Sequence, residues 1–145
     1  MYKKILVPLD GSALAEKALD HAEKLAEAFE AEVILLQVVP FMPVYGAPEL
    51  VVPFVVDEKQ QVAAEKYLTH LAEGLTKSGL KIATKVKVGM QVAAEIIDFA
   101  KEGGIDLIVM CTHGRSGITR WVLGSVAHKV LTRAETPILL VHLRK

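Results

Sequence analysis

The stretch Lys4-Ile5-Leu6-Val7-Pro8-Leu9-Asp10-Gly11-Ser12 combines a continuous apolar run with a turn and the expected start of a helix. An apolar run without alternation is typical of a strand in a parallel sheet, where helices cover both faces. The turn ends at Ser12, a residue type that favours the N-cap position of a helix. After it, apolar side chains recur on one helical face at Leu14, Ala18, Ala22, Leu25 and Phe29. The chain therefore begins with a strand followed by an amphipathic helix.

The same alternation continues along the chain. Further continuous apolar runs are Val33–Leu36, Leu107–Met110 and Ile138–Val141. Residues 81–88 instead alternate lysines with apolar side chains, which is typical of a strand at the edge of a sheet. Helical spacing recurs at Ala64, Leu68, Leu71 and Leu75, and again at Val92, Ile96 and Phe99. Asp57 is an expected N-cap, and glycines at 79, 103 and 104 stand where helices are expected to end. Such strand–helix units predict an α/β fold with five strands in a parallel sheet.

Length, composition and charge limit the class of protein. The 145 residues (15.8 kDa) suit one domain, 1–145. Lys plus Arg is 17 and Asp plus Glu is 17, so the balanced charge argues against a nucleic-acid or anionic-membrane binder. No apolar run reaches the roughly 18 to 20 residues of a membrane span, and the N-terminal run is too short for a signal peptide. The single cysteine, Cys111, forms no internal disulfide, so we expect a cytoplasmic protein.

Residues 111–133 contain no Asp or Glu and are the best candidate for an anion site. They include the basic residues Arg115, Arg120, Lys129 and Arg133. Gly114 and Gly117 follow the expected strand that ends at Met110, so backbone N–H groups there can approach a phosphate closely. Gly124 and Ser125 open another helical stretch, with Ser125 a possible N-cap, and a helix N-terminus favours negative charge. The alternative is that the glycines only form a turn and the arginines are solvated.

Other chemically capable residues have a structural and a functional interpretation. Asp10 follows the first expected strand, where it can bind a ribose hydroxyl or a metal ion, or cap the helix with Ser12. His113 has no carboxylate or thiol at a recognisable catalytic spacing, so a catalytic role is not favoured. At the end of a buried strand, Cys111 is expected to be an apolar filler rather than a reactive thiol. Surface positions are expected for His21, His70 and His128, and a packing role for Trp121.

Four segments together resemble the universal stress proteins, in particular their nucleotide-binding branch. The segments are Lys4–Ser12, Ile108–Gly117, Leu123–Ala127 and Thr136–Val141. The ATP motif of that family is G-x-x-G followed by nine residues and G-[ST]. It falls on Cys111, Gly114, Gly124 and Ser125, so the spacing is kept and cysteine replaces the first glycine.

The resemblance implies a doubly wound, Rossmann-like sheet of order 3-2-1-4-5 with helices on both faces. It also implies a homodimer paired through Ile138–Val141, and ATP bound with Mg²⁺ close to Asp10. The nucleotide-binding residues that it implies are Pro8, Leu9, Asp10, Val38, Met110, Cys111, Thr112, His113, Gly114, Arg115, Ser116, Gly117, Gly124, Ser125 and Val126.

The expected function is that of an ATP-binding, dimeric regulatory or protective module of the stress response. No general base is evident, so no catalytic residue is assigned and at most weak ATP hydrolysis is expected. One alternative is an ATP-hydrolysing or nucleotidyl-transferring enzyme. Another is a protein-interaction module in which Cys111 blocks the pocket and residues 41–56 form a surface for an unknown protein partner. That segment lies within 40–56, which carries four of the six prolines, and its role as lid, partner surface or dimer packing stays open.

Overall fold

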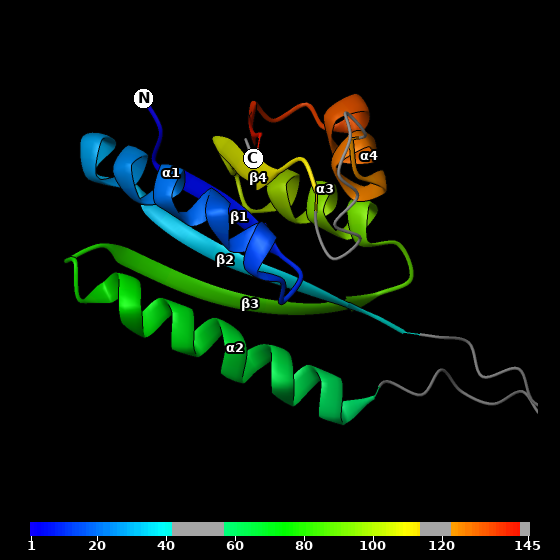
Figure 1. Ribbon diagram of the computed structural model, residues 1–145. Coiled ribbons are helices and arrows are strands. Elements are labelled where there is room, and N and C mark those ends of the chain that lie inside the picture. The colour runs from blue at the N-terminus through cyan, green and yellow to red at the C-terminus, as the bar shows by residue number, and fades with distance from the viewer. Residues whose placement is uncertain (42–56, 114–122, 143–145) are drawn as a thin grey trace, which may run out of the picture.

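A computed structural model describes residues 1–41, 57–113 and 123–142 (Figure 1). The elements run in the order β1 (Lys4–Leu9), α1 (Ala13–Phe29), β2 (Glu32–Pro40), α2 (Glu58–Thr76), β3 (Lys81–Gly89), α3 (Val92–Glu102), β4 (Leu107–Cys111), α4 (Ser125–Arg133) and β5 (Ile138–Val141). All strand pairs are parallel, and the sheet order is β3-β2-β1-β4-β5. The predicted fold class and strand order are thereby confirmed.

Helices cover both faces of the sheet, with α1 and α2 on one face and α3 and α4 on the other. Successive strand residues point to opposite faces, so Val7 and Val109 pack under α1 while Leu6 and Ile108 pack on the α3–α4 face. All of these side chains are fully buried. The continuous apolar runs that predicted the central strands are the direct consequence of this two-sided cover.

Side chains cap the first two helices as expected. The Ser12 hydroxyl accepts a hydrogen bond from Ala15 N at 3.2 Å, and the Asp57 carboxylate accepts one from Lys59 N at 3.0 Å. Helix α4 differs from the expectation, because Gly124 is its N-cap and Ser125 is already its first helical residue. The interpretation of Ser125 as an N-cap was therefore wrong.

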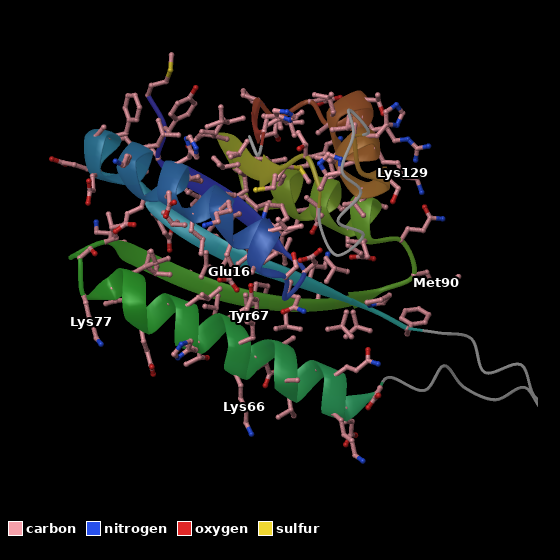
Figure 2. All side chains as sticks on the ribbon, viewed as in Figure 1. Glu16, Lys66, Tyr67, Lys77, Met90 and Lys129 are labelled. Atoms are coloured by element: carbon pink, nitrogen blue, oxygen red, sulfur yellow. The ribbon has the colours of Figure 1, made fainter. Side chains whose placement is uncertain are left out.

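The helices α1 and α2 are also joined to each other. The Tyr67 hydroxyl of α2 donates a hydrogen bond of 2.9 Å to the Glu16 carboxylate in the first turn of α1 (Figure 2). Burial, this hydrogen bond and the nearby charges of Glu16 and Asp10 raise the pKa of Tyr67, so the phenol stays protonated. The bond fixes the first turn of α1 from the α2 side.

The two sheet edges are strands of different character. On β3 the lysine face is partly solvated, and Lys87 forms an ion pair of 2.8 Å with Glu95 of α3. On β5, Ile138, Leu139 and Leu140 are half-buried. The predicted edge positions are confirmed, whereas pairing of β5 across a homodimer stays a prediction. Residues 42–56 lie outside the described part of the chain, and within that part no helix is long and apolar enough to cross a bilayer.

Candidate functional site

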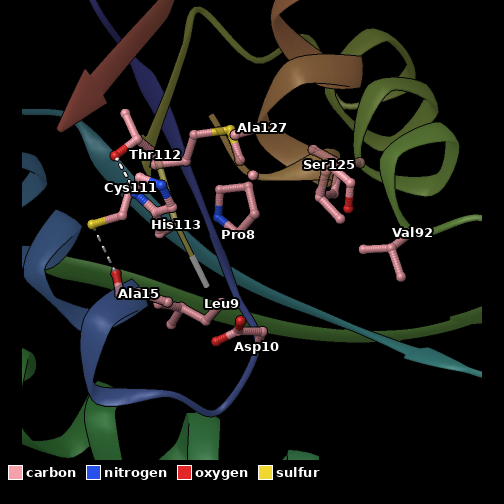
Figure 3. Close-up of a pocket in the computed structure, with 14 residues that line it drawn as sticks. Pro8, Leu9, Asp10, Ala15, Val92, Cys111, Thr112, His113, Ser125 and Ala127 are labelled. Atoms are coloured by element: carbon pink, nitrogen blue, oxygen red, sulfur yellow. Dashed lines mark hydrogen bonds between the residues drawn. The ribbon is translucent and has the colours of Figure 1, made fainter. Parts of the chain in front are cut away.

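A pocket of about 300 Å³ lies at the carboxyl ends of β1 and β4 (Figure 3). The helices that follow these neighbouring strands pass to opposite faces of the sheet, which opens a crevice between them. The pocket is lined by Pro8, Leu9, Asp10, Ala15, Val92, Ile96, Met110, Cys111, Thr112, His113, Gly124, Ser125, Val126 and Ala127. Its position is the usual ligand site of an open α/β sheet.

Asp10 performs the structural role and lines the pocket as well. Its Oδ1 accepts hydrogen bonds from the backbone N of Ser12 at 2.9 Å and from the Ser12 hydroxyl at 2.6 Å. The same hydroxyl accepts the bond from Ala15 N that caps α1. The two interpretations of Asp10 are therefore compatible, because one carboxylate orders the turn and contributes negative charge to the pocket wall.

The sulfur of Cys111 points toward α1. Its Sγ donates to the carbonyl oxygen of Ala15 at 3.7 Å, and the residue packs in the core under α1 (Figure 3). Burial raises the pKa of the Cys111 thiol, a backbone hydrogen bond at Ala18 opposes this, and the charge of Asp10 adds to the rise. A buried, neutral thiol is a packing group rather than a nucleophile. Cys111, which stands where the family motif has its first glycine, thus has its hydrogen-bond partner on α1 and not on α4.

Gly124 brings the start of α4 against the end of β4. Its backbone N donates a 2.7 Å hydrogen bond to the carbonyl oxygen of Thr112. A Cβ at this position would stand 3.0 Å from the same oxygen and 3.7 Å from the Cα of His113. A side chain at this position would therefore require the Thr112 carbonyl to move by a few tenths of an ångström. Gly124 has no side chain to cap α4, so among the described residues no N-cap side chain accepts from the first-turn N–H groups of this helix, which starts at the pocket.

Ten of the fifteen implied nucleotide-binding residues line this pocket: Pro8, Leu9, Asp10, Met110, Cys111, Thr112, His113, Gly124, Ser125 and Val126. Val38 lies on β2 in the core of the α3–α4 face, 8% exposed, and is not among the lining residues. Gly114, Arg115, Ser116 and Gly117 lie outside the described residues, as do Arg120 and Trp121. The predicted surface histidines, His21, His70 and His128, are exposed.

Sequence reasoning missed four lining residues, Ala15, Val92, Ile96 and Ala127. Ala15, Val92 and Ala127 come from the first turns of α1, α3 and α4, and Ile96 lies one turn further along α3. A general rule could have found them, since the helix starts of an α/β sheet surround the carboxyl ends of its strands.

The charge of the described lining is small. Asp10 is its only carboxylate, and it contains no Lys or Arg. Within the described ranges no three His, Cys, Asp or Glu side chains gather as a metal-ligating group. A single carboxylate nonetheless suits Mg²⁺ that arrives with a nucleotide, because Mg²⁺ usually takes one or two protein carboxylates together with phosphate and water.

Comparison with known proteins gives one consistent result. The model of the universal stress protein family matches residues 1–142. Universal stress protein MJ0531 of Methanocaldococcus jannaschii is 40% identical to this chain, and the match covers 97% of this chain and 82% of MJ0531. Universal stress protein YxiE of Bacillus subtilis is 35% identical, and the match covers 97% of this chain and 99% of YxiE. The solved structure of MJ0577 has a TM-score of 0.68 at 30% identity and covers 100% and 99% of the two chains.

A crystal structure of a universal stress protein in complex with cAMP has a TM-score of 0.72 at 25% identity and covers 97% of each chain. The fold, the family match over nearly the whole chain and the identity to these relatives agree. The chain belongs to the universal stress protein family.

Proposed function

We propose that this protein binds ATP with Mg²⁺ in the pocket between β1 and β4 and acts as a nucleotide-dependent regulatory or protective module of the stress response. The observation that carries the proposal is the start of α4, which receives no side-chain cap from its N-cap residue, Gly124, and is held by it against the end of β4 at the pocket wall. Helix N-termini of this kind bind phosphate through backbone N–H groups.

Relatives support an adenine nucleotide as the ligand. Besides the protein solved with cAMP, universal stress proteins of similar fold have been solved with dAMP, from Archaeoglobus fulgidus, and with AMP, from Arabidopsis thaliana. Their sequence identities to this chain are 25%, 24% and 18%. The shared part of these ligands is adenosine with a phosphate group, which matches a pocket that has an apolar wall and a helix N-terminus.

The lining residues divide into three groups by chemistry. Apolar side chains such as Leu9, Val92 and Ile96 suit the nucleoside. The first-turn N–H groups of Ser125, Val126 and Ala127 suit the phosphates, and Asp10 suits a ribose hydroxyl or the Mg²⁺ ion. From the family pattern we add Val38 near the base, and Gly114, Arg115, Ser116 and Gly117 near the ribose and phosphates.

We propose binding rather than rapid turnover on the basis of the titratable groups in the described lining. These are Asp10, Cys111 and His113. The thiol is buried and neutral, and Oδ1 of Asp10 already accepts two hydrogen bonds from Ser12. No described group is placed as a dedicated general base for an attacking water. We therefore propose that ATP hydrolysis is at most slow.

Calorimetric titration of folded, nucleotide-free protein with ATP, with and without Mg²⁺, tests the proposal. We expect a dissociation constant on the order of micromolar. Gly124→Ala should weaken binding about tenfold or more, because its Cβ would press on the Thr112 carbonyl and move the start of α4.

The matched control is Gly74→Ala in α2, where a Cβ meets nothing within 4 Å and binding should not change. If folded, nucleotide-free protein binds no adenine nucleotide, the proposal is wrong and the protein-interaction alternative is favoured.

A further inference from the structure

The first turn of α1 lies at the pocket and is held by contacts from three elements. Ala15 of this turn is one of the lining residues. From the β1 side, the Ser12 hydroxyl accepts a 3.2 Å hydrogen bond from Ala15 N and donates one of 2.6 Å to Asp10. From β4, the Cys111 thiol donates to the Ala15 carbonyl at 3.7 Å. The turn is thus tied to both of the strands whose ends form the pocket.

The third contact comes from α2, which is otherwise separate from the site. The Tyr67 hydroxyl donates a 2.9 Å hydrogen bond to Oε1 of Glu16 (Figure 2). None of the described lining residues belongs to α2, so this bond reaches the pocket turn from outside. Both side chains are half-buried, and a hydrogen bond to a charged acceptor is strong where water is partly excluded. The bond is therefore a firm link between α2 and the pocket turn.

A short path leads from Tyr67 to the Asp10 carboxylate. The backbone N of Glu16 donates to the Ser12 carbonyl at 3.4 Å, and the backbone N and hydroxyl of Ser12 both donate to Asp10 Oδ1. Burial, the bond to Glu16 and the charges of Glu16 and Asp10 all raise the pKa of Tyr67. The phenol therefore stays protonated and remains a donor, and it lies within the field of both carboxylates.

Loss of the phenol hydroxyl would disturb this path at Glu16. In the described structure Tyr67 is the only side chain that donates to the Glu16 carboxylate. A half-buried carboxylate without a donor is unfavourable, so Glu16 would turn outward to regain a hydrogen bond from water. Its backbone would move with it, and the 3.4 Å bond to the Ser12 carbonyl would weaken. The turn that holds Asp10 at the pocket wall would then be less ordered.

We propose that Tyr67 is a positioning residue of the nucleotide site, which acts through Glu16 to hold the first turn of α1 and Asp10 in the arrangement that binds ATP with Mg²⁺. The inference rests on the proposed function and adds α2 to the elements that determine affinity. Linkage makes the effect reciprocal. If the bond strengthens ATP binding by some factor, bound ATP strengthens the bond by the same factor. Helix α2 is therefore held more firmly to α1 in the ATP-bound protein.

Calorimetry with ATP and Mg²⁺ on Tyr67→Phe tests the role of the hydroxyl. This change keeps the ring that packs against the core, and we expect the affinity to fall about fivefold. The matched control is Tyr2→Phe, the same chemical change on a ring that packs edge-to-face on Phe29, with centroids 5.1 Å apart. Phe29 is the last residue of α1, so this control alters the opposite end of the same helix and should leave the affinity unchanged.

A double-mutant cycle determines whether Tyr67 acts through Glu16. In a Glu16→Ala background, Tyr67→Phe should cause no further loss of ATP affinity, because the acceptor is already absent. In a Glu16→Gln background, which keeps an oxygen acceptor, part of the effect of Tyr67→Phe should remain. A packing role of Tyr67 that is independent of Glu16 would instead give the same loss in every background.

A measurement on the unmodified protein keeps the inference testable should a variant not fold. In protein labelled with ¹³C at the tyrosine rings, we expect the Tyr67 resonance to move on saturation with ATP and Mg²⁺. The Tyr2 resonance, from the other end of α1, should stay in place.

Three results overturn the inference while nucleotide binding stands. They are an ATP affinity of Tyr67→Phe equal to that of the unmodified protein, an equal loss with and without Glu16, and a Tyr67 resonance that does not respond to ATP. If the unmodified protein itself binds no ATP, the proposed function fails, and the inference fails with it.

Discussion

At residue 111 the direction of one sulfur atom determines what the departure from the family motif means. The Sγ lies against the Ala15 carbonyl under α1, so restoring glycine would remove buried contacts without enlarging the phosphate end of the pocket. We expect Cys111→Gly to lower the free energy of unfolding by about 2 kcal/mol, through the lost side chain and the flexibility of glycine in a strand. Its affinity for ATP should stay within about twofold of the unmodified protein. Urea unfolding and calorimetry measure the two effects, and a tenfold gain in ATP affinity would show instead that the cysteine obstructs the site.

A second residue, Asp106, stabilises the opposite end of the sheet in a pH-dependent way. Its Oδ2 accepts hydrogen bonds from the backbone N of Lys3 at 2.8 Å and of Lys4 at 2.9 Å, and these bonds lower the pKa of Asp106 in the folded protein. A lowered folded pKa means that the stabilisation is complete above the unfolded value of about 4 and is lost as the pH falls through the folded value.

Asp106→Ala should therefore cost about 1 kcal/mol near neutral pH, a figure reduced for the solvent exposure of the carboxylate, and less as the pH approaches 3. Melting curves between pH 7 and pH 3 measure this difference, with Asp20→Ala, an exposed residue of α1, as the control. A difference in stability that does not shrink on acidification would contradict the assignment.

At the scale of the elements, strand existence was predictable and strand length was not. The run Val33–Leu36 predicted β2, which in fact continues to Pro40. The pattern stops at the polar Gln37, yet this residue is only 9% exposed and continues the strand, because β2 pairs with both β1 and β3 at that point. Lateral pairing is a tertiary effect that a single sequence does not encode locally.

The candidate site, like the strands, could be predicted from the sequence only in part. The residues at the ends of β1 and β4 were predictable, because an apolar run followed by Asp, Thr or Gly marks where a strand ends. The contributions of Val92 and Ile96 were not, since helical periodicity does not specify which strand end a helix will cover. The need for glycine at 124 likewise depends on the Thr112 carbonyl, which is distant in sequence and adjacent only in the fold.

The N-cap of α1 offers a test of how one element supports the site. Ser12→Ala removes the hydroxyl that caps α1 and donates to Asp10, so we expect a loss of about 1 kcal/mol in stability and weaker ATP binding. Asp57→Ala removes the corresponding cap from α2, which lines no part of the pocket, and should cost similar stability without changing the affinity. Urea unfolding and calorimetry on both variants separate helix stability from site order. Equal ATP affinity in the two variants would show that the Asp10 turn does not depend on its serine.

At the scale of the whole molecule, the two sheet edges differ in a way that bears on assembly. The lysines of β3 discourage pairing with another strand, whereas β5 presents the half-buried apolar residues Ile138, Leu139 and Leu140. An edge strand with partly exposed apolar side chains is favourable only when another protein surface covers it. A second copy of β5 would do so around a two-fold axis and would leave the pocket, at the ends of β1 and β4, outside the paired edge.

We therefore expect the protein to sediment at twice its chain mass of 15.8 kDa, and Leu140→Lys to shift it toward the monomer, because a lysine on an edge strand disfavours pairing with another strand. The control is Val62→Lys on α2, a residue 47% exposed and remote from β5, which should leave the sedimented mass unchanged. Melting temperatures of both variants establish that the folded protein is being compared. A monomeric unmodified protein at concentrations of tens of micromolar would contradict pairing through β5. A Leu140→Lys protein that stays dimeric would move the interface to another surface.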